Sequence, residues 1–268
     1  RACDASGAIF GQSMTGGIVG ENLGSIVSCR GRAYVNIEST DPSIDLSNLN
    51  LEFSLDLAKL SRADTLNTAT DTGGIAGYSS GAIASSTNYA AVGYQHIGYN
   101  IGGVVGRSSG QVLACSNEGA ICGRKDVGGI AGIVSDDSFV INCYSTVEKI
   151  TANSSYASVV GYSKKGNLQN IYGNSACPSK SAANSAVGSD KAAGTVWKKT
   201  TFALLSLDEM KSGAVTVPSS GESCANFAAA LNAGAALFND TPAETLPGKP
   251  DVVLRKWTAS ESYPVLEK

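Results

Sequence analysis

The chain contains a single histidine, His96, so imidazole chemistry could occur at only one place. A catalytic triad needs a nucleophile, a general base and a group that orients the base, all within hydrogen-bonding reach. His96 lies among Tyr94, Tyr99 and Asn100, a composition typical of a turn, and the H-E-x-x-H motif of zinc proteases is absent. We therefore interpret His96 as an exposed turn residue and not as a catalytic base.

Seven cysteines are the other candidates for nucleophilic or metal chemistry. None belongs to a C-x-x-C pair, and with one histidine available a zinc site is not expected. Free cysteine is commonly buried as a small apolar side chain, so we predict buried thiols, although one or two disulfides are also compatible with the sequence. The odd number leaves at least one thiol unpaired. The cysteines are Cys3, Cys29, Cys115, Cys122, Cys143, Cys177 and Cys224.

Asp136 and Asp137 form an acidic doublet inside the glycine-rich part of the chain. Glycosidases use two carboxylates that flank one bond, and a calcium site needs about six or more oxygen ligands. Few other oxygen ligands surround this doublet in the sequence, and the corresponding positions elsewhere form turns, so we expect a solvated turn. The sequence thus predicts no catalytic, cofactor-binding or metal-binding residue, and we expect the chain not to be an enzyme.

Composition favours tightly turned β structure. Glycine supplies 31 of 268 residues, 16% of the residues are charged, and the net charge is −3 without a dense basic run, which gives no support for nucleic-acid binding. The hydrophobic content of 43% argues against disorder, and no stretch approaches the ~20 apolar residues of a membrane helix. The first residues resemble the middle of a repeat, so we expect a fragment or a mature chain of a larger protein.

A repeat is the strongest signal in the sequence. The pattern G-G-[IV]-[AV]-G begins at residues 16, 73, 102 and 128, and a degenerate copy, A-S-V-V-G, begins at residue 157, so the spacings are 57, 29, 26 and 29 residues. Each copy holds two or three short β-type segments bounded by Gly, Ser or Asn, and neither helical repeats nor the leucine-rich ladder is present. We predict an all-β parallel solenoid, right-handed by the crossover rule, built from repeats of about 26–29 residues.

Equal positions in successive coils of a solenoid form ladders along its axis. Ile18, Ile75, Val104 and Ile130 share one position, and we predict that they are buried in one ladder. Asn88 and Asn117 share another and should form an amide ladder at a turn. Cys115 and Cys143 share a third; aligned Cβ vectors are poorly set for a disulfide, so we predict free interior thiols. We expect glycines at corners where a Cβ would clash or φ must be positive.

The repeat resembles a known family. The G-G-[IV]-[AV]-G core, a Gly four residues later and a following strand of the type in R-S-S-G-Q-V-L-A-C, at residues 107–115, are similar to the GLUG motif, over about residues 11 to 175. GLUG repeats occur in bacterial surface and secreted proteins, including adhesins and non-catalytic regions of IgA-specific metallopeptidases. The resemblance implies an extracellular or bacterial cell-surface location, and it implies no catalytic residues.

The remaining chain is divided into segments. We assign residues 1–185 to the solenoid, with an irregular insertion at 38–72 that is either a divergent coil with a protruding loop or a strand–helix excursion. Residues 186–268 form a connecting segment and a small α+β C-terminal cap, whose sequence resembles segments that close such arrays. Here we expect a helix opened by the capping box at residues 206–209, a second helix at about 223–233 that ends near Gly234 and covers the end of the solenoid, and strands at 252–254 and 264–266.

Three functions are compatible with these features. The first is a non-catalytic structural or adhesive module of a surface or secreted protein. The second is a carbohydrate- or mucin-binding module, and the third is a glycan-active β-helix enzyme. The predicted partners are a host glycan or an extracellular protein, together with other domains of a larger chain, and no cofactor. An aromatic-lined cleft would favour the second function, and converging carboxylates would favour the third.

Overall fold

The computed structural model describes residues 1–37, 69–95, 97–135, 137–177, 179–180, 185–190, 200–246, 249 and 251–267. His96, Asp136 and residues 38–68 of the predicted insertion lie outside these described residues. Of the predicted insertion, residues 69–72 are described, and residue 70 begins a strand of the second coil.

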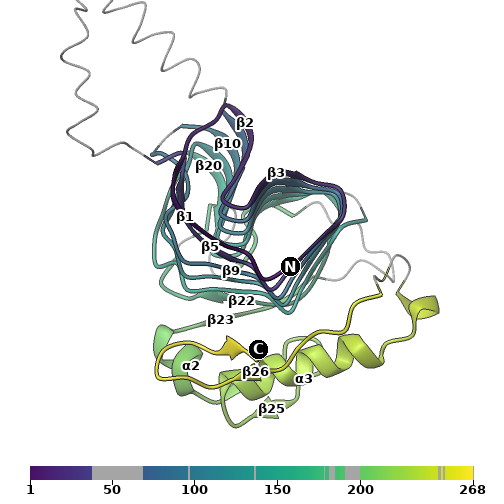
Figure 1. Ribbon diagram of the computed structural model, residues 1–268. Helices are drawn as coiled ribbons and strands as arrows, with labels where there is room; N and C mark the ends of the chain where they lie inside the picture. The colour runs from purple at the N-terminus through teal and green to yellow at the C-terminus, as the bar shows by residue number, and fades with distance from the viewer. Residues whose placement is uncertain are drawn as a thin grey trace, which may run out of the picture.

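The chain winds into a parallel β-solenoid whose coils are stacked along one axis (Figure 1). The first strands of the coils are β2 (Ser13–Gly16), β6 (Thr70–Gly73), β10 (Tyr99–Gly102), β15 (Lys125–Gly128) and β20 (Ser154–Ala157). The second strands are β3 (Val19–Asn22), β7 (Ala76–Ser79), β11 (Val105–Ser108), β16 (Ala131–Val134) and β21 (Val160–Ser163). Each set forms a five-stranded sheet.

The third and fourth strands belong to one larger sheet. The third strands are β4 (Ser25–Val27), β8 (Ala82–Ala84), β12 (Gln111–Leu113) and β17 (Phe139–Ile141). The fourth are β1 (Asp4–Ile9), β5 (Arg30–Val35), β9 (Thr87–Asn88), β13 (Ser116–Asn117) and β18 (Tyr144–Ser145). The long strand β22 (Asn167–Asn174) pairs with both β17 and β18 and so joins the two sets. Two short strands, β14 (Ile121–Cys122) and β19 (Ile150–Thr151), pair beside the large sheet.

The register follows the sequence repeat. Ala76, Val105, Ala131 and Val160 lie opposite one another in consecutive coils, and all of these pairings are parallel. The parallel solenoid predicted from the spacing of the G-G-[IV]-[AV]-G copies is therefore confirmed. The repeat period is the number of residues needed to return to the same place one strand spacing further along the axis.

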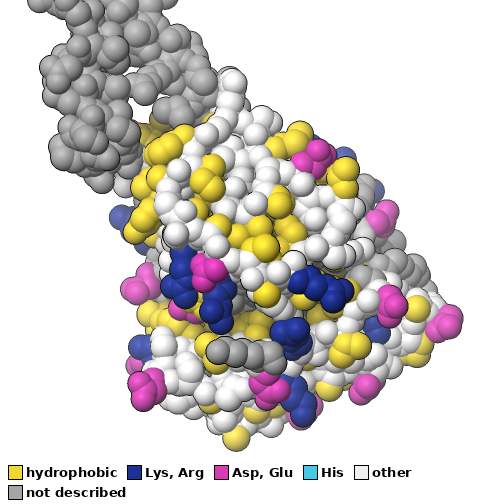
Figure 2. Space-filling model, in the orientation of Figure 1, with side chains coloured by type: hydrophobic (Ala, Val, Ile, Leu, Met, Phe, Trp, Pro, Cys, Tyr) yellow, Lys and Arg dark blue, Asp and Glu magenta, His cyan; other side chains and the backbone are white. Residues whose placement is uncertain are grey.

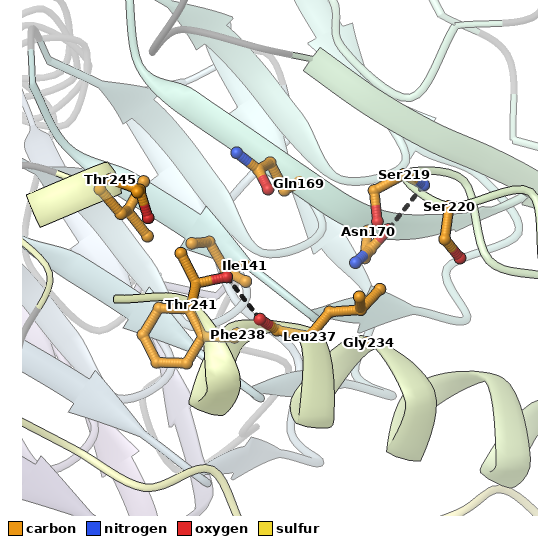
Figure 3. A pocket seen from close by; sticks show the side chains of 11 residues that line it. Ile141, Gln169, Asn170, Ser219, Ser220, Gly234, Leu237, Phe238, Thr241 and Thr245 are labelled. Atoms are coloured by element: carbon orange, nitrogen blue, oxygen red, sulfur yellow. Dashed lines mark hydrogen bonds between the residues drawn. The ribbon is translucent and has the colours of Figure 1, made fainter. Parts of the chain in front are cut away.

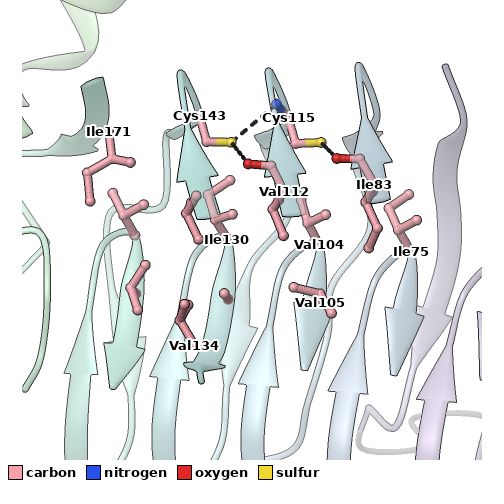
Figure 4. Packing of buried hydrophobic residues seen from close by; sticks show 14 of the residues in the cluster. Ile75, Ile83, Val104, Val105, Val112, Cys115, Ile130, Val134, Cys143 and Ile171 are labelled. Carbon is pink, nitrogen blue, oxygen red and sulfur yellow. Dashed lines mark hydrogen bonds between the residues drawn. The ribbon is translucent and has the colours of Figure 1, made fainter. Parts of the chain in front are cut away.

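The predicted interior ladder is present (Figure 4). Ile75, Val104 and Ile130 are fully buried, and the N–H of Val104 donates to the carbonyl oxygen of Ile130 at 2.9 Å. Ile18 hydrogen-bonds to Ile75 in the same ladder but is only partly buried. Ile18 is less buried because no described strand pairs with β3 on the side away from β7. Ladder burial is thus complete inside the stack and partial at its first full coil.

The asparagine and cysteine ladders are both present, but Asn88 and Asn117 lie in strands β9 and β13 and not at a turn. The Asn88 amide donates to Oδ1 of Asn117 at 2.8 Å, and both side chains are fully buried. Cys115 and Cys143 occupy equivalent interior positions in successive coils, with the Cys115 N–H 3.4 Å from the Cys143 sulfur. All seven cysteines are free thiols, as predicted for this pair. The hydrogen bond between the buried Asn88 and Asn117 amides links successive coils and favours this register.

The motif glycines are required for close approach of backbones. A Cβ on Gly102 would lie 2.0 Å from the carbonyl oxygen of Val105 and 2.8 Å from the Gly132 nitrogen. The motif glycines thus meet the expectation through the clash that a Cβ would make, whereas most corners with positive φ are occupied by other residue types. These left-handed corner residues include Ser28, Ser85, Ala114, Asn142 and Asn170. Asn tolerates this conformation well, whereas Ala and Ser must be held in it by the neighbouring coils.

The solenoid is longer than the repeats recognised from sequence. Strand β1 pairs in register with β5, and the N–H of Cys3 lies 3.4 Å from the sulfur of Cys29, so Cys3 precedes Cys29 in the cysteine ladder. At the other side, Val187 pairs in parallel with Val160, within a segment that the sequence assigned to a connection. Residues 185–190 thus begin a further coil, which the sequence did not reveal because its motif has lost the leading glycines.

The C-terminal part is a small α+β region, as predicted. It contains β23 (Thr200–Leu205), α2 (Leu207–Ser212), β24 (Val215–Thr216), β25 (Ser223–Cys224), α3 (Phe227–Asp240), a 3-10 turn at Ala243–Thr245, β26 (Trp257–Thr258) and β27 (Val265–Leu266). The predicted capping box is present, with the Ser206 N–H donating to Glu209 at 2.7 Å. The predicted strand at 264–266 is confirmed, whereas residues 252–254 are not a strand.

Helix α3 differs from its prediction at both ends. It begins at Phe227, after the N-cap Asn226, and it continues through Gly234 to Asp240. Gly234 lies inside the helix and faces the solenoid closely: a Cβ there would lie 2.6 Å from Oδ1 of Asn142. The glycine thus serves helix–solenoid contact and not a C-cap.

The C-terminal region covers the side of the solenoid, which we call the flank. The flank is formed by outward-facing apolar residues of several coils, namely Ala84, Leu113, Ile141, Tyr144 and Tyr172. Figure 1 shows α2, α3 and β26 beside β22 and β23, alongside the stacked coils. The expectation that the second helix covers the solenoid end is therefore wrong. Strand β23 does pair with β22, the last strand of the large sheet. The outward row of apolar side chains needs cover along its length, which explains this placement.

Candidate binding cavity

Within the described residues, neither the cysteines nor Asp137 takes part in a catalytic arrangement. Asp137 is exposed in a turn with φ +61°. No cluster of three or more His, Cys, Asp or Glu side chains suited to a metal ion occurs in the described parts of the chain. Burial raises the pKa of the Cys143 thiol well above its usual range and that of Cys177 to about 11. These thiols are protonated at neutral pH and are therefore weak nucleophiles.

Thiol labelling tests the buried cysteine ladder. In native protein without reductant, a maleimide should modify exposed Cys3 readily and leave Cys115 and Cys143 unmodified, because both are fully buried. In denaturant all seven should react, as counted by mass spectrometry. Rapid native labelling of Cys115 or Cys143 would contradict their interior placement, and a pair that stays unlabelled after denaturation would reveal a disulfide.

Alkaline pH should destabilise the fold. Burial raises the pKa of Cys177 to about 11, whereas an unfolded cysteine has a pKa of about 8.5, so the folded chain keeps a proton that the unfolded chain releases. The contribution of this thiol is complete below about pH 8.5 and is lost progressively up to about pH 11. Urea unfolding at pH 7.0, 8.5 and 10 should show a falling free energy of unfolding, and the Cys177→Ala variant should fall less steeply. A free energy that rises at pH 10 would contradict this assignment.

An ion pair joins two coils on the outside of the solenoid. The Arg107 guanidinium lies 2.8 Å from the carboxylate of Asp71, whose side chain is 4% exposed, and it stacks 4.7 Å from the centre of the Tyr78 ring. The Asn100 amide also donates to Asp71 at 2.7 Å. Because both acceptor oxygens of Asp71 are engaged by protein groups, this cluster stabilises the stack and does not present a free site.

Two cavities lie between the solenoid and the C-terminal region. The first, of about 290 Å³, lies under α3 and is lined mainly by amides, hydroxyls and apolar groups such as Gln169, Ser220 and Leu237 (Figure 3). The second, of about 350 Å³, brings charged and aromatic side chains together, and we call it the flank cavity. It is lined by Ala2, Cys3, Asp4, Ser28, Cys29, Arg30, Ser85, Thr87, Tyr89, Glu118, Arg255, Pro264, Val265, Leu266 and Glu267.

One ladder of the large sheet contributes to the solenoid wall of the flank cavity. Arg30 and Thr87 lie opposite each other in β5 and β9, and the same ladder continues to Tyr144 and Tyr172 in later coils. The two tyrosines fill the space beneath the C-terminal region, where their rings lie 5.3 and 5.0 Å from that of Phe227. In the first coils this ladder consists of Arg30 and Thr87 and contains no tyrosine. The flank cavity lies there, where no tyrosine ring of the ladder fills the space between the solenoid and the C-terminal region.

The C-terminal wall is held in place by hydrogen bonds to rigid elements. The Tyr144 hydroxyl donates to the carbonyl oxygen of Pro264 at 2.8 Å, and the backbone N–H of Trp257 donates to Oδ1 of Asn232 on α3 at 2.7 Å. Strands β26 and β27 pair antiparallel, which fixes Val265 and Leu266. The two walls, although they come from opposite parts of the chain, are therefore positioned before any ligand binds.

Charges of both signs gather at this cavity. Arg32, beside it, lies 3.5 Å from Asp4 and stacks 4.8 Å from the centre of the Tyr89 ring. Burial raises the pKa of the partly buried Glu118 carboxyl, and the nearby Arg32 charge partly opposes this. Burial and the Glu118 charge raise the pKa of Tyr89. Figure 2 shows basic and acidic side chains along the boundary between the solenoid and the C-terminal region.

Comparisons with known proteins give no match: no family model, no curated protein and no solved structure matches the chain. Among the described residues, no helix has the length and apolar character needed to cross a membrane.

The sequence contains a signal for part of the solenoid wall of this cavity. Arg32, Tyr89 and Glu118 share one repeat position, immediately after the residues of the asparagine ladder. Large polar residues at the same position of successive coils must lie in one row on the outer surface. The contribution of Arg255 and Glu267 had no such signal, because their approach depends on how the C-terminal region packs.

Proposed function

We propose that this chain is a non-catalytic structural and adhesive module of a bacterial cell-surface or secreted protein, of the GLUG-motif type. The observation that carries the proposal is the in-register stacking of the motif copies, in which Gly73, Gly102 and Gly128 lie opposite one another. Because every coil contacts its neighbours, such a stack forms a stiff spacer. The resemblance to GLUG repeats supports an extracellular location.

The outer surface of the stack suits attachment. In-register stacking sets side chains of equal position in rows, so that a partner meets a repeated surface. One such row consists of the partly exposed residues Tyr78, Arg107, Ile133 and Tyr162. Repeat proteins use extended surfaces of this kind for binding. We propose a host glycan or an extracellular protein as the partner.

A bead assay tests this function. Beads that carry the whole chain should adhere to mucin-coated or matrix-protein-coated glass more than beads that carry serum albumin at equal density. The double variant Tyr78→Ala with Tyr162→Ala changes the outer row and should reduce adhesion if that row is the contact surface. Adhesion of the wild-type beads no greater than that of the albumin beads on every surface would contradict the proposal.

A further inference from the structure

We propose that the flank cavity binds an uncharged, hydroxyl-rich sugar of the size of a monosaccharide or disaccharide. This inference rests on the proposed adhesive function, because it names the ligand that one face of the module would hold. The cavity volume of about 350 Å³ lies near the lower end of the range for small-molecule sites. Both of its walls are anchored, so a ligand would not have to order them.

The cavity offers the hydrogen-bonding groups that a sugar needs. Sugar hydroxyls both donate and accept, so a sugar site requires acceptors and donors within one cavity. The carboxylates of Glu118 and Glu267 are acceptors, and the guanidinium groups of Arg30 and Arg255 are donors.

The cavity also offers apolar contact. The faces of a sugar ring carry C–H groups, which pack on aromatic and aliphatic surfaces. Tyr89 supplies an aromatic ring on the solenoid wall, and the Arg32 guanidinium 4.8 Å from the ring centre holds that ring in position. Pro264, Val265 and Leu266 supply aliphatic surface on the C-terminal wall. A sugar between the two walls would contact both.

The balance of charges favours an uncharged ligand. Two guanidinium groups line the cavity, from Arg30 and Arg255, and three carboxylates line it, from Asp4, Glu118 and Glu267. A sialylated or sulfated sugar would place its charge near these carboxylates, and a cationic ligand would approach the guanidinium groups. A neutral sugar gains hydrogen bonds from both kinds of group and avoids like-charge repulsion.

Titration calorimetry with the whole chain tests this site. N-acetyllactosamine and diacetylchitobiose serve as neutral probes, and 3′-sialyllactose serves as the acidic counterpart. We expect at least one neutral probe to bind, more tightly than the acidic one. Glu118→Gln and Tyr89→Ala should each weaken that binding by about 10-fold or more. Gln169→Ala, in the separate cavity under α3, should leave it within about twofold.

A second readout keeps the test independent of stability. Amide chemical shifts of labelled protein should change on addition of the neutral probe at Ser85, Glu118 and Leu266, and the melting temperature of Glu118→Gln should match that of wild type. The inference is overturned if neither neutral probe binds, if 3′-sialyllactose binds more tightly, or if the shift changes lie outside the flank cavity. If beads that carry the wild-type chain adhere but the wild-type chain binds neither neutral probe, the sugar site is overturned and the adhesive function stands. If the wild-type chain binds a neutral probe but its beads do not adhere, the adhesive function is overturned and the sugar site stands.

Discussion

Gly102→Ala should lower the free energy of unfolding by about 3 kcal/mol, measured by urea denaturation. The added methyl carbon would lie 2.0 Å from the Val105 carbonyl oxygen and 2.8 Å from backbone atoms of the next coil. All of these neighbours are main-chain atoms fixed by sheet hydrogen bonds, so no side chain can move aside. Relief requires distortion of the turn between β10 and β11, which holds Val105, together with displacement from the next coil, and both changes weaken the buried ladder at Val104.

Gly24→Ala is the matched control. Gly24 also lies in the repeats, but its added Cβ would meet no atom within 4 Å, and its backbone is not in the left-handed region. Its free energy of unfolding should therefore stay within about 0.5 kcal/mol of wild type. Equal effects of the two substitutions would show that the coils do not approach as closely at Gly102 as the structure indicates.

Phe227→Ala should detach the start of α3 from the flank and cost about 3–5 kcal/mol. The Phe227 ring is fully buried and packs edge-to-face with Tyr144 at 5.3 Å and Tyr172 at 5.0 Å, so its removal leaves a cavity between two coils and the helix. The same variant should weaken sugar binding, since Tyr144 positions Pro264 on the cavity wall.

Leu237→Ala provides a control on the same helix, because Leu237 is 42% exposed and loses little burial. We expect a cost of less than about 1 kcal/mol for this variant. If Phe227→Ala is no more destabilising than Leu237→Ala in urea denaturation, the C-terminal region does not pack on the flank as described.

The sequence was sufficient to predict the stacked solenoid, but not that the C-terminal region packs on its flank. Positions such as Asn88 and Asn117 recur at the coil period, and recurrence alone places them in one ladder. Leu113 and Ile141 alternate correctly with the interior residues Val112 and Val140, so they must face outward. No local pattern indicates that a helix more than 80 residues later covers them, although Asn142 donates to the Leu231 carbonyl oxygen across a separation of 89 residues.

The same limit applies to the candidate site. The row of Arg32, Tyr89 and Glu118 follows from the repeat, and its position on the outer surface could have been predicted. The cavity exists because that row meets residues 255 and 264–267, and this meeting depends on tertiary packing. Gly234 shows the same effect, because a glycine that resembles a helix end is instead a contact point between α3 and the solenoid.

Backbone NMR of the isotope-labelled chain tests the stacked solenoid most directly, because the ladders, the flank and the cavity all depend on it. Nuclear Overhauser effects should link backbone protons of residues one repeat apart, at the pairs Ala76 and Val105, Val105 and Ala131, and Ala131 and Val160. The amide protons of Ile75, Val104 and Ile130, which donate to the next coil, should exchange with solvent more slowly than those of the exposed residues around Leu23. Antiparallel contacts at these positions, or fast exchange at Val104, would contradict the account.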